Sequence, residues 1–177
     1  MTYDDELDDD ADASSSEHTF LTFLVGDDQY AVPVQCVTEI VRLQKTYGLP
    51  DVPTYVRGVI NLRGKVIPLL DVRSRFGMPH TIYSDRTVVV VLEHDEASTG
   101  LVVDGVCEVT EILPATVESR QKLGHQSGNS MVSGVGMRAD GVVFLLDVPT
   151  VLSGSRPELA PARPVSIPAR AAQRSTT

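Results

Sequence analysis

The sequence contains no tryptophan, only two cysteines and no long apolar run. With four Phe and five Tyr among 177 residues, its core must be built mainly from aliphatic side chains. Aliphatic stretches such as residues 88–92 are far shorter than the roughly 20 residues of a membrane-spanning helix. No early segment joins a basic start to an apolar run of signal-peptide length. We therefore expect a cytoplasmic protein without direct membrane insertion.

Residue patterns that support catalysis or metal binding are also scarce. Cys36 and Cys107 form no Cys-x-x-Cys pair, and the four histidines stand in no metal-ligand spacing. The sequence has no Gly-x-Ser-x-Gly turn and no phosphate-binding glycine loop. We expect two reduced, buried cysteines, no metal, no cofactor and no enzymatic activity. A reactive thiol, with Cys36 as the nucleophile of a small hydrolase, is the alternative.

Charge is concentrated at the two ends of the chain. Residues 1–17 carry eight acids and no Lys or Arg, while residues 153–177 carry four Arg, one Glu and several prolines. Both segments have too little apolar surface to offset the entropy of ordering. We predict disordered tails at 1–17 and 153–177 around a folded domain at 18–152. The folded part is slightly acidic, which disfavours nucleic-acid binding.

Apolar and polar residues alternate with a period of two between glycine turns, which predicts an all-β fold with few short helices. The expected strands are residues 20–25, 30–34, 37–43, 58–62, 66–70, 87–93, 100–104, 107–113, 133–137 and 142–146. Short helical segments are expected at 72–76, 115–123 and 148–152. Asp71 and Asp147 precede two of these segments and are predicted to cap them. A catalytic carboxylate pair is the alternative interpretation.

Three motifs occur twice along the chain in the same order. The paired segments are 37–40 with 109–112 at an offset of 72, and 58–59 with 134–135 and 66–72 with 142–148 at an offset of 76. We predict two copies of a five-strand unit, subdomain 1 at about 18–80 and subdomain 2 at about 86–152. Short strands and tight turns are typical of small closed barrels, which leave no exposed sheet edge. Chance similarity among abundant aliphatic residues is the alternative.

Five cationic residues gather around the glycines and the aliphatic strand pair of the first unit. They are Arg57, Arg63, Lys65, Arg73 and Arg75. One interpretation is a solvated rim, with Arg73 and Arg75 directed outward from a helical turn. The other is an edge that binds anions or another protein. Composition cannot decide between the two interpretations.

Residues 55–77, YVRGVINLRGKVIPLLDVRSRFG, resemble the signature of the CheW family of chemotaxis coupling proteins. The resemblance extends, in order, over roughly residues 18–152. It implies two SH3-like five-stranded β-barrels, in agreement with the internal repeat. It also implies a non-enzymatic adaptor that couples the cytoplasmic tip of chemoreceptors to the regulatory domain of a CheA-type histidine kinase, recruited to membrane-associated receptor arrays. The regulatory module of such a kinase is the alternative function.

The resemblance also assigns roles to individual residues. The implied receptor-binding positions are Val37, Glu39, Gly58, Arg63 and Gly64, and the implied kinase-binding positions are Arg42, Leu43, Arg63 and Lys65. The chain departs from the family at 116–131, where relatives often carry a proline-containing loop that supports a second, ring-forming kinase contact. The resemblance does not extend to that contact.

Overall fold

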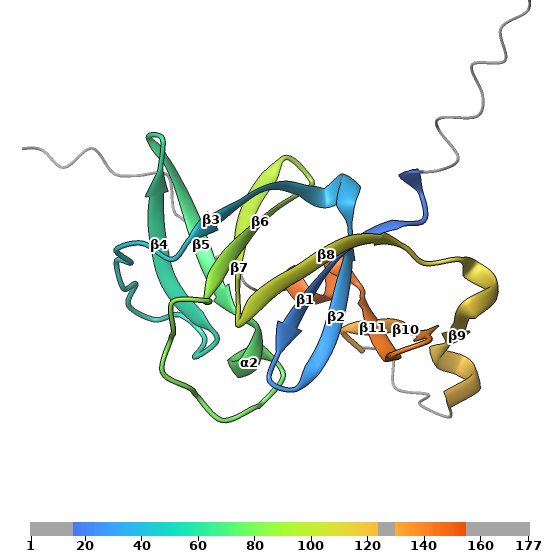
Figure 1. Ribbon diagram of the computed structural model, residues 1–177. Helices are drawn as coiled ribbons and strands as arrows, with labels where there is room; N and C mark the ends of the chain where they lie inside the picture. Colours follow the sequence, from blue (N-terminus) through green and yellow to red (C-terminus); the bar gives the residue numbers. More distant parts are fainter. Residues whose placement is uncertain (1–15, 124–129, 155–177) are drawn as a thin grey trace, which may run out of the picture.

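The computed structural model describes residues 16–123 and 130–154, so the disorder predicted for the outer parts of both tails lies outside the described residues. Within these ranges the chain forms eleven strands and a few short helices, arranged as two curled sheets (Figure 1). The predicted all-β class is confirmed. No helix in the described ranges has the length and apolar character needed to span a membrane.

The first barrel is a five-stranded sheet in the order β3-β6-β7-β5-β4. Its strands are β3 (Val37–Arg42), β6 (Val88–His94), β7 (Ala97–Val103), β5 (Lys65–Asp71) and β4 (Val56–Leu62). Neighbouring strands are antiparallel except β5 and β7, which are parallel. Tyr47, in the loop after β3, forms an isolated bridge with Val59 of β4. This bridge joins the two edges of the sheet and closes the SH3-like barrel.

The second barrel is a sheet in the order β8-β1-β2-β11-β10-β9. Its strands are β8 (Gly105–Glu111), β1 (Thr19–Val25), β2 (Asp28–Pro33), β11 (Gly141–Leu146), β10 (Val132–Arg138) and β9 (Val117–Ser119). The sheet has one strand more than the predicted five-strand unit, because β9 is an additional three-residue strand. The parallel pair is here β2 and β11, the counterparts of β7 and β5.

Strand β9 lies inside the segment for which a helix was expected. Residues 115–123 instead contribute to two 3-10 turns, Pro114–Thr116 and Arg120–Leu123, on either side of β9. The helix prediction is wrong because Val117 pairs with Gly136 of β10 and packs against a small apolar cluster of the second barrel. Gly134 permits this approach, since a Cβ there would lie 2.9 Å from a methyl group of Val117.

Each barrel contains a hairpin from the other half of the chain. The β1–β2 hairpin pairs with β8 and β11, whereas the β6–β7 hairpin pairs with β3 and β5. Figure 1 shows the blue β1–β2 hairpin beside the orange strands β10 and β11. The contiguous division at 18–80 and 86–152 therefore does not coincide with the two barrels. Alternation along a strand indicates which face is buried but does not identify the neighbouring strand.

The predicted offset of 76 holds for the hairpins β4–β5 and β10–β11. Both pairs change register at the same place, between Val56 and Gly58 in the first and between Val132 and Gly134 in the second. A bulge of this kind bends the strand and increases its twist, as barrel closure requires. The repeat is therefore present in the backbone as well as in the sequence.

The predicted offset of 72 for the motif at 37–40 does not hold. Val37 of β3 pairs with Leu92 of β6, and Val106 of β8 pairs with Phe23 of β1. Because β6–β7 and β1–β2 are equivalent hairpins, Val37 corresponds to Val106, an offset of 69. The structural equivalent of residues 37–40 is therefore 106–109. The similar motif at 109–112 lies three residues further along β8.

The largest apolar cluster lies between the barrels and belongs to both. It joins Phe23 and Val32 of the β1–β2 hairpin to Leu92 and Leu101 of the β6–β7 hairpin. The side chain of Val72, just after β5, completes this central core, and all five are fully buried. Each barrel has only a smaller cluster of its own. The two barrels therefore share the apolar burial that stabilises them.

The two short helices begin where the sequence predicted. Helix α2 (Val72–Arg75) starts at Asp71, whose Oδ1 accepts a hydrogen bond from the Ser74 amide at 3.2 Å. Helix α3 (Val148–Leu152) starts at Asp147, whose Oδ1 accepts from the Thr150 amide at 3.1 Å. Both predictions of an N-cap are confirmed.

The two cysteines have different surroundings. Cys36 is partly buried against the central core, but Cys107 is exposed on β8. The prediction of two buried cysteines is wrong for Cys107, because β8 is an edge strand that pairs only with β1. Desolvation nevertheless raises the pKa of both thiols above the ordinary value, which disfavours the reactive thiolate.

Candidate docking groove

A groove lies at the end of the first barrel where the β4–β5 turn approaches β3. It encloses a concavity of about 290 Å³. The lining residues come from five strands and one turn: Thr38, Glu39, Leu62, Arg63, Lys65, Ile67, Val91, Glu93 and Ser98. Three of the predicted site residues, Glu39, Arg63 and Lys65, are therefore brought together although the first two are 24 positions apart.

The β4–β5 turn presents Arg63 above this groove. Leu62 and Lys65 pair across the hairpin, so Arg63 and Gly64 are its two loop residues. Both have positive φ, 53° and 81°, as a type I′ turn requires. Gly64 adopts this conformation without strain, and its amide donates to Asn61 Oδ1 at 2.9 Å. Gly64 therefore sets the shape of the turn that carries Arg63.

Glu39 and Arg63 form a two-point ion pair across the groove. Arg63 Nη2 lies 2.9 Å from Glu39 Oε2, and Nη1 lies 3.1 Å from Oε1. The Arg63 side chain is 77% exposed and that of Glu39 25% exposed. An exposed pair of this kind contributes only about 0.2–1 kcal/mol to stability. The guanidinium of Arg63 and the carboxylate of Glu39 reach solvent, so a partner protein bound there would be able to form charge-assisted hydrogen bonds with either group.

Gly58 closes the barrel and does not line the groove. It lies at the β4 bulge with φ 129°, and a Cβ at this position would collide with the Tyr47 carbonyl. This close approach is the one that permits the Tyr47–Val59 bridge. Val37 is likewise outside the groove lining, because it packs half-buried against the central core.

The predicted kinase-binding residues do not form one surface. Lys65 lies in the groove, where its Nζ donates to Ser98 Oγ at 2.8 Å. Arg42 pairs with Val88 at the opposite end of β6, and Leu43 packs against the first barrel's own apolar cluster. Arg42 is three residues beyond Glu39 along β3, about 10 Å at 3.3 Å per residue, and does not line the groove.

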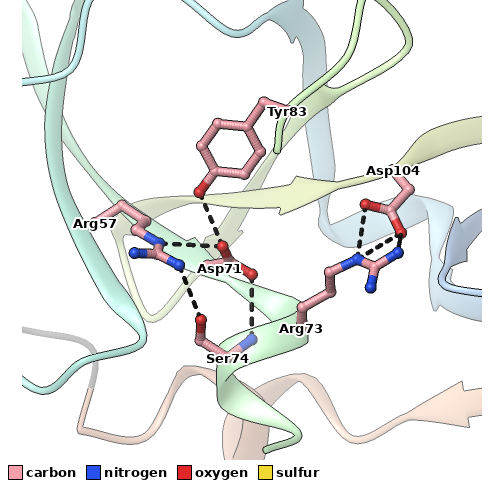
Figure 2. A network of polar contacts seen from close by, with 6 residues as sticks. All are labelled: Arg57, Asp71, Arg73, Ser74, Tyr83 and Asp104. Carbon is pink, nitrogen blue, oxygen red and sulfur yellow. Dashed lines mark hydrogen bonds and ion pairs between the residues drawn. The ribbon is translucent and has the colours of Figure 1, made fainter. Parts of the chain in front are cut away.

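The remaining cationic residues of the first unit are held by partners within the protein. Asp71 is 3% exposed, and its Oδ2 accepts from Arg57 Nε at 3.1 Å and from the Tyr83 hydroxyl at 2.8 Å. Arg57 also donates to Ser74 Oγ at 3.1 Å. Figure 2 shows Arg57 and Tyr83 converging on Asp71 at the start of α2. This network around the buried Asp71 was not predicted, because the sequence assigned Asp71 only a capping role.

The network perturbs the ionisation of Tyr83. Burial is the main cause, and the hydrogen bond to Asp71 adds to it, so that the pKa of Tyr83 rises to about 12. The neutral phenol is therefore the form that holds the loop before β6 against α2.

Arg73 and Arg75 do not project freely into solvent, so the expected outward orientation is wrong. Arg73 forms an ion pair with Asp104 at 2.8 Å, between β7 and β8 (Figure 2). Arg75 donates to the carbonyls of Thr150, Val151 and Ser153, at the end of α3. These contacts cross from the first barrel's helix to elements of the second. Of the five cations, Arg63 and Lys65 remain at the exposed groove.

The second barrel carries an ion pair near the corresponding hairpin turn, and only its acidic partner is equivalent to that of the first barrel. Glu108 corresponds to Glu39 at the offset of 69, and its Oε1 accepts from Arg138 Nη2 at 2.6 Å. Arg138 Nε also lies 3.4 Å from Asp140 in the β10–β11 turn. This pair was missed because the motif at 109–112 misplaced the register. Aligning the hairpin turns identifies Glu108 as the counterpart of Glu39, whereas Arg138 corresponds to Leu62 at the offset of 76.

Neither a metal centre nor an enclosed small-molecule site is apparent in the described part of the chain. No group of three or more His, Cys, Asp or Glu residues there could hold a metal ion. The groove mixes charged and apolar side chains and is open to solvent, whereas small-molecule sites bury most of the ligand in an apolar cavity. Two small barrels with such a groove define a protein-docking module.

Similarity to known proteins identifies the family. The model of the CheW-like domain matches residues 19–156, and the chain belongs to this family. The chemotaxis protein CheW of Klebsiella aerogenes is 28% identical over 134 residues, covering 76% of this chain and 81% of the relative. That of Helicobacter pylori is 31% identical over 133 residues, covering 75% and 80%.

A solved structure agrees with this assignment. The scaffolding protein TtCheW from Thermoanaerobacter tengcongensis has a TM-score of 0.70 and 25% sequence identity. The match covers 77% of this chain and 93% of that one. The family assignment supports a role in chemotaxis coupling, and both the predicted family and the two-barrel architecture are confirmed.

Proposed function

We propose that this protein is a non-enzymatic adaptor that couples the cytoplasmic tips of chemoreceptors to a CheA-type histidine kinase. The observation that carries the proposal is the exposed Glu39–Arg63 pair above an open groove, in a member of the CheW family. The adaptor works in the cytoplasm, at membrane-associated receptor arrays. It needs no metal, cofactor or catalytic residue, because its role is to bind two proteins at once.

The receptor occupies the groove of the first barrel. Glu39 and Arg63 offer charge-assisted hydrogen bonds, which become stronger when a partner excludes water from them. Gly64 sets the turn that carries Arg63, and Gly58 permits the barrel closure beneath it. Val37 supports the start of β3 from the core side. The five predicted receptor-binding positions thus divide into two contact residues and three that shape the surface.

The kinase regulatory domain binds a separate surface. Arg42 and Leu43 lie at the far end of β3 from the groove, so a partner there leaves the groove accessible. Arg63 and Lys65 contact the kinase only where it extends around the barrel end. Separate surfaces allow one adaptor to hold both partners simultaneously.

Two pull-down assays test this function. The full-length protein is mixed with a receptor signalling fragment in one assay and with the kinase regulatory domain in the other. We expect both to be retained, and the receptor fragment to be lost with Glu39→Lys but kept with Glu118→Lys. Glu118 is a matched control because it forms an exposed ion pair with Lys122 on the second barrel. Retention of neither partner by the parent protein would contradict the proposal.

A further inference from the structure

The groove of the first barrel has a second polar side besides its ion pair. Glu93, Ser98 and Lys65 line this side from β6, β7 and β5. Glu93 and Ser98 pair directly across the β6–β7 hairpin, so their side chains leave the sheet on the same face. Val91 and Ile67, two positions from Glu93 and Lys65 along their strands, belong to the first barrel's own apolar cluster. The two charges therefore stand at the rim of a groove with an apolar floor.

The two charges at this rim are not paired with each other. Lys65 Nζ donates to Ser98 Oγ at 2.8 Å, and an ammonium group has two further hydrogens to donate. Glu93 is exposed, and no ion pair or hydrogen bond joins its side chain to another residue in the described ranges. A carboxylate and an ammonium group are therefore both available to a protein that enters the groove.

The second barrel shows that the fold does not require these polar residues. The hairpin pairings identify the equivalent positions. The second barrel has Leu24, Gln29 and Gly141 where the first has Glu93, Ser98 and Lys65. A barrel of the same design thus forms without a charge at any of the three positions. The charged rim of the first barrel is therefore a feature of its groove and not of barrel closure.

The strands beneath this rim limit the form of a partner. In the sheet order, β6, β7 and β5 each have a neighbour on both sides, so their backbone groups are occupied and a partner cannot add a strand there. The groove offers side chains instead, which suits an amphipathic helix that places an apolar side chain on the floor. Residues three, four or seven positions apart lie on one face of such a helix.

We propose that Glu93 and Lys65 determine which receptor segment the groove accepts. The segment is a helix with an apolar side chain over the floor, a Lys or Arg beside Glu93 and an Asp or Glu beside Lys65. Its two charged residues lie on one face, three, four or seven positions apart. The reverse orientation of the helix would bring like charges together, so the rim also fixes the direction of the helix. This inference rests on the proposed receptor binding by the groove and adds the chemistry of the segment that binds.

The first experiment measures the contribution of Glu93 by titration calorimetry. The full-length protein is titrated with a receptor signalling fragment, and Glu93→Gln is compared with Glu96→Gln. Glu96 is a matched control because it is exposed in the same hairpin and does not line the groove. We expect Glu93→Gln to weaken binding by about 10-fold through the loss of a charge-assisted contact, and the control to bind like the parent.

The second experiment exchanges charges between the two proteins. Each Lys and Arg of the receptor fragment is changed to Glu, one at a time, and each Asp and Glu to Lys. We expect one basic position whose variant binds the parent weakly and recovers with Glu93→Lys. One acidic position should behave in the same way with Lys65→Glu. The two positions should lie three, four or seven residues apart in the receptor sequence.

The outcomes separate this inference from the adaptor function. Parental affinity in Glu93→Gln, in a protein that still loses the fragment with Glu39→Lys, would overturn the inference and leave the adaptor function intact. Failure of every receptor variant to recover with Glu93→Lys would overturn it as well, provided that thermal melts show this variant to be folded. Glu93→Gln keeps the size of the side chain, so it decides the question if Glu93→Lys is not folded. Binding of neither receptor nor kinase by the parent would instead contradict the proposed function itself.

Discussion

The Glu39–Arg63 pair permits a test that separates a direct contact from a structural role. Charge reversal in Glu39→Lys or Arg63→Glu removes a two-point ion pair whose arginine is 77% exposed. Solvent screens such a pair, so each variant should lose only about 0.2–1 kcal/mol of stability. In a domain of this size that corresponds to a fall in Tm of no more than about 4 °C.

The expected effect on binding is much larger. Truncating a charged contact that is desolvated in a complex costs about 2–5 kcal/mol, and about 1.4 kcal/mol is a tenfold change in Kd. Each single reversal should therefore weaken receptor binding by about 30-fold or more. The double reversal, Glu39→Arg with Arg63→Glu, restores an ion pair with opposite polarity. We expect it to recover the parental Tm but not the receptor affinity.

Thermal melts and titration calorimetry with a receptor fragment provide the two measurements. Glu118→Lys serves as the control, because it breaks an exposed pair of 3.5 Å on the other barrel. Parental affinity in both single variants would refute a role for the pair in binding. Recovery of affinity in the double reversal would refute direct contact with the partner, since the pair would then act only by shaping the groove.

Three further predictions concern the fold that supports the groove. The pKa of Tyr83 is raised from 10.0 to about 12, so Tyr83 stabilises the folded state below pH 10 and loses this effect as the pH rises to about 12. Tyr83→Phe should flatten the dependence of the free energy of unfolding on pH between these values. Urea titrations that give the same pH dependence for the variant and the parent would contradict this prediction. Gly58→Ala should lower the free energy of unfolding by about 2 kcal/mol or more, because the new Cβ collides with backbone. Gly64→Ala should lower it by about 1 kcal/mol, because the position has positive φ but open space around it. Equal Tm values for the two variants would argue against the collision at Gly58. Fragments 1–80 and 81–177 should each lack a cooperative melt and regain one when mixed, because each barrel needs a hairpin from the other fragment. A cooperative melt of either fragment alone would contradict this prediction.

Local signals in the sequence were sufficient for most individual elements. The alternation around β5 and the aspartates before α2 and α3 identified those elements within one or two residues. Each signal depends on residues close together in the chain, such as Asp71 and Ser74, whose amide donates a hydrogen bond to the Asp71 carboxylate. Capping and alternation are short-range effects, so a single sequence contains them.

The errors concern interactions between distant segments. Val117 forms a strand because it meets Gly136, 19 positions away, and no local pattern indicates that meeting. Cys107 is exposed because β8 has only one neighbour. The assignment of Glu39 and Arg63 to one site came from the family resemblance, and the structure then placed the two side chains in contact. Their contribution to binding remains a prediction.

The exchange of hairpins bears on how an adaptor could transmit a signal. Two docking surfaces are useful for coupling only if the protein between them keeps their relative geometry. Here each barrel is completed by the other half of the chain, the largest apolar cluster lies between the barrels, and Arg75 joins α2 to the last turn of α3. Separating the barrels would expose that cluster and break both hairpin exchanges, so a hinge at their junction would cost much of the stability of the fold. A partner in the groove would therefore hold the distant end of β3, with Arg42 and Leu43, in a fixed orientation.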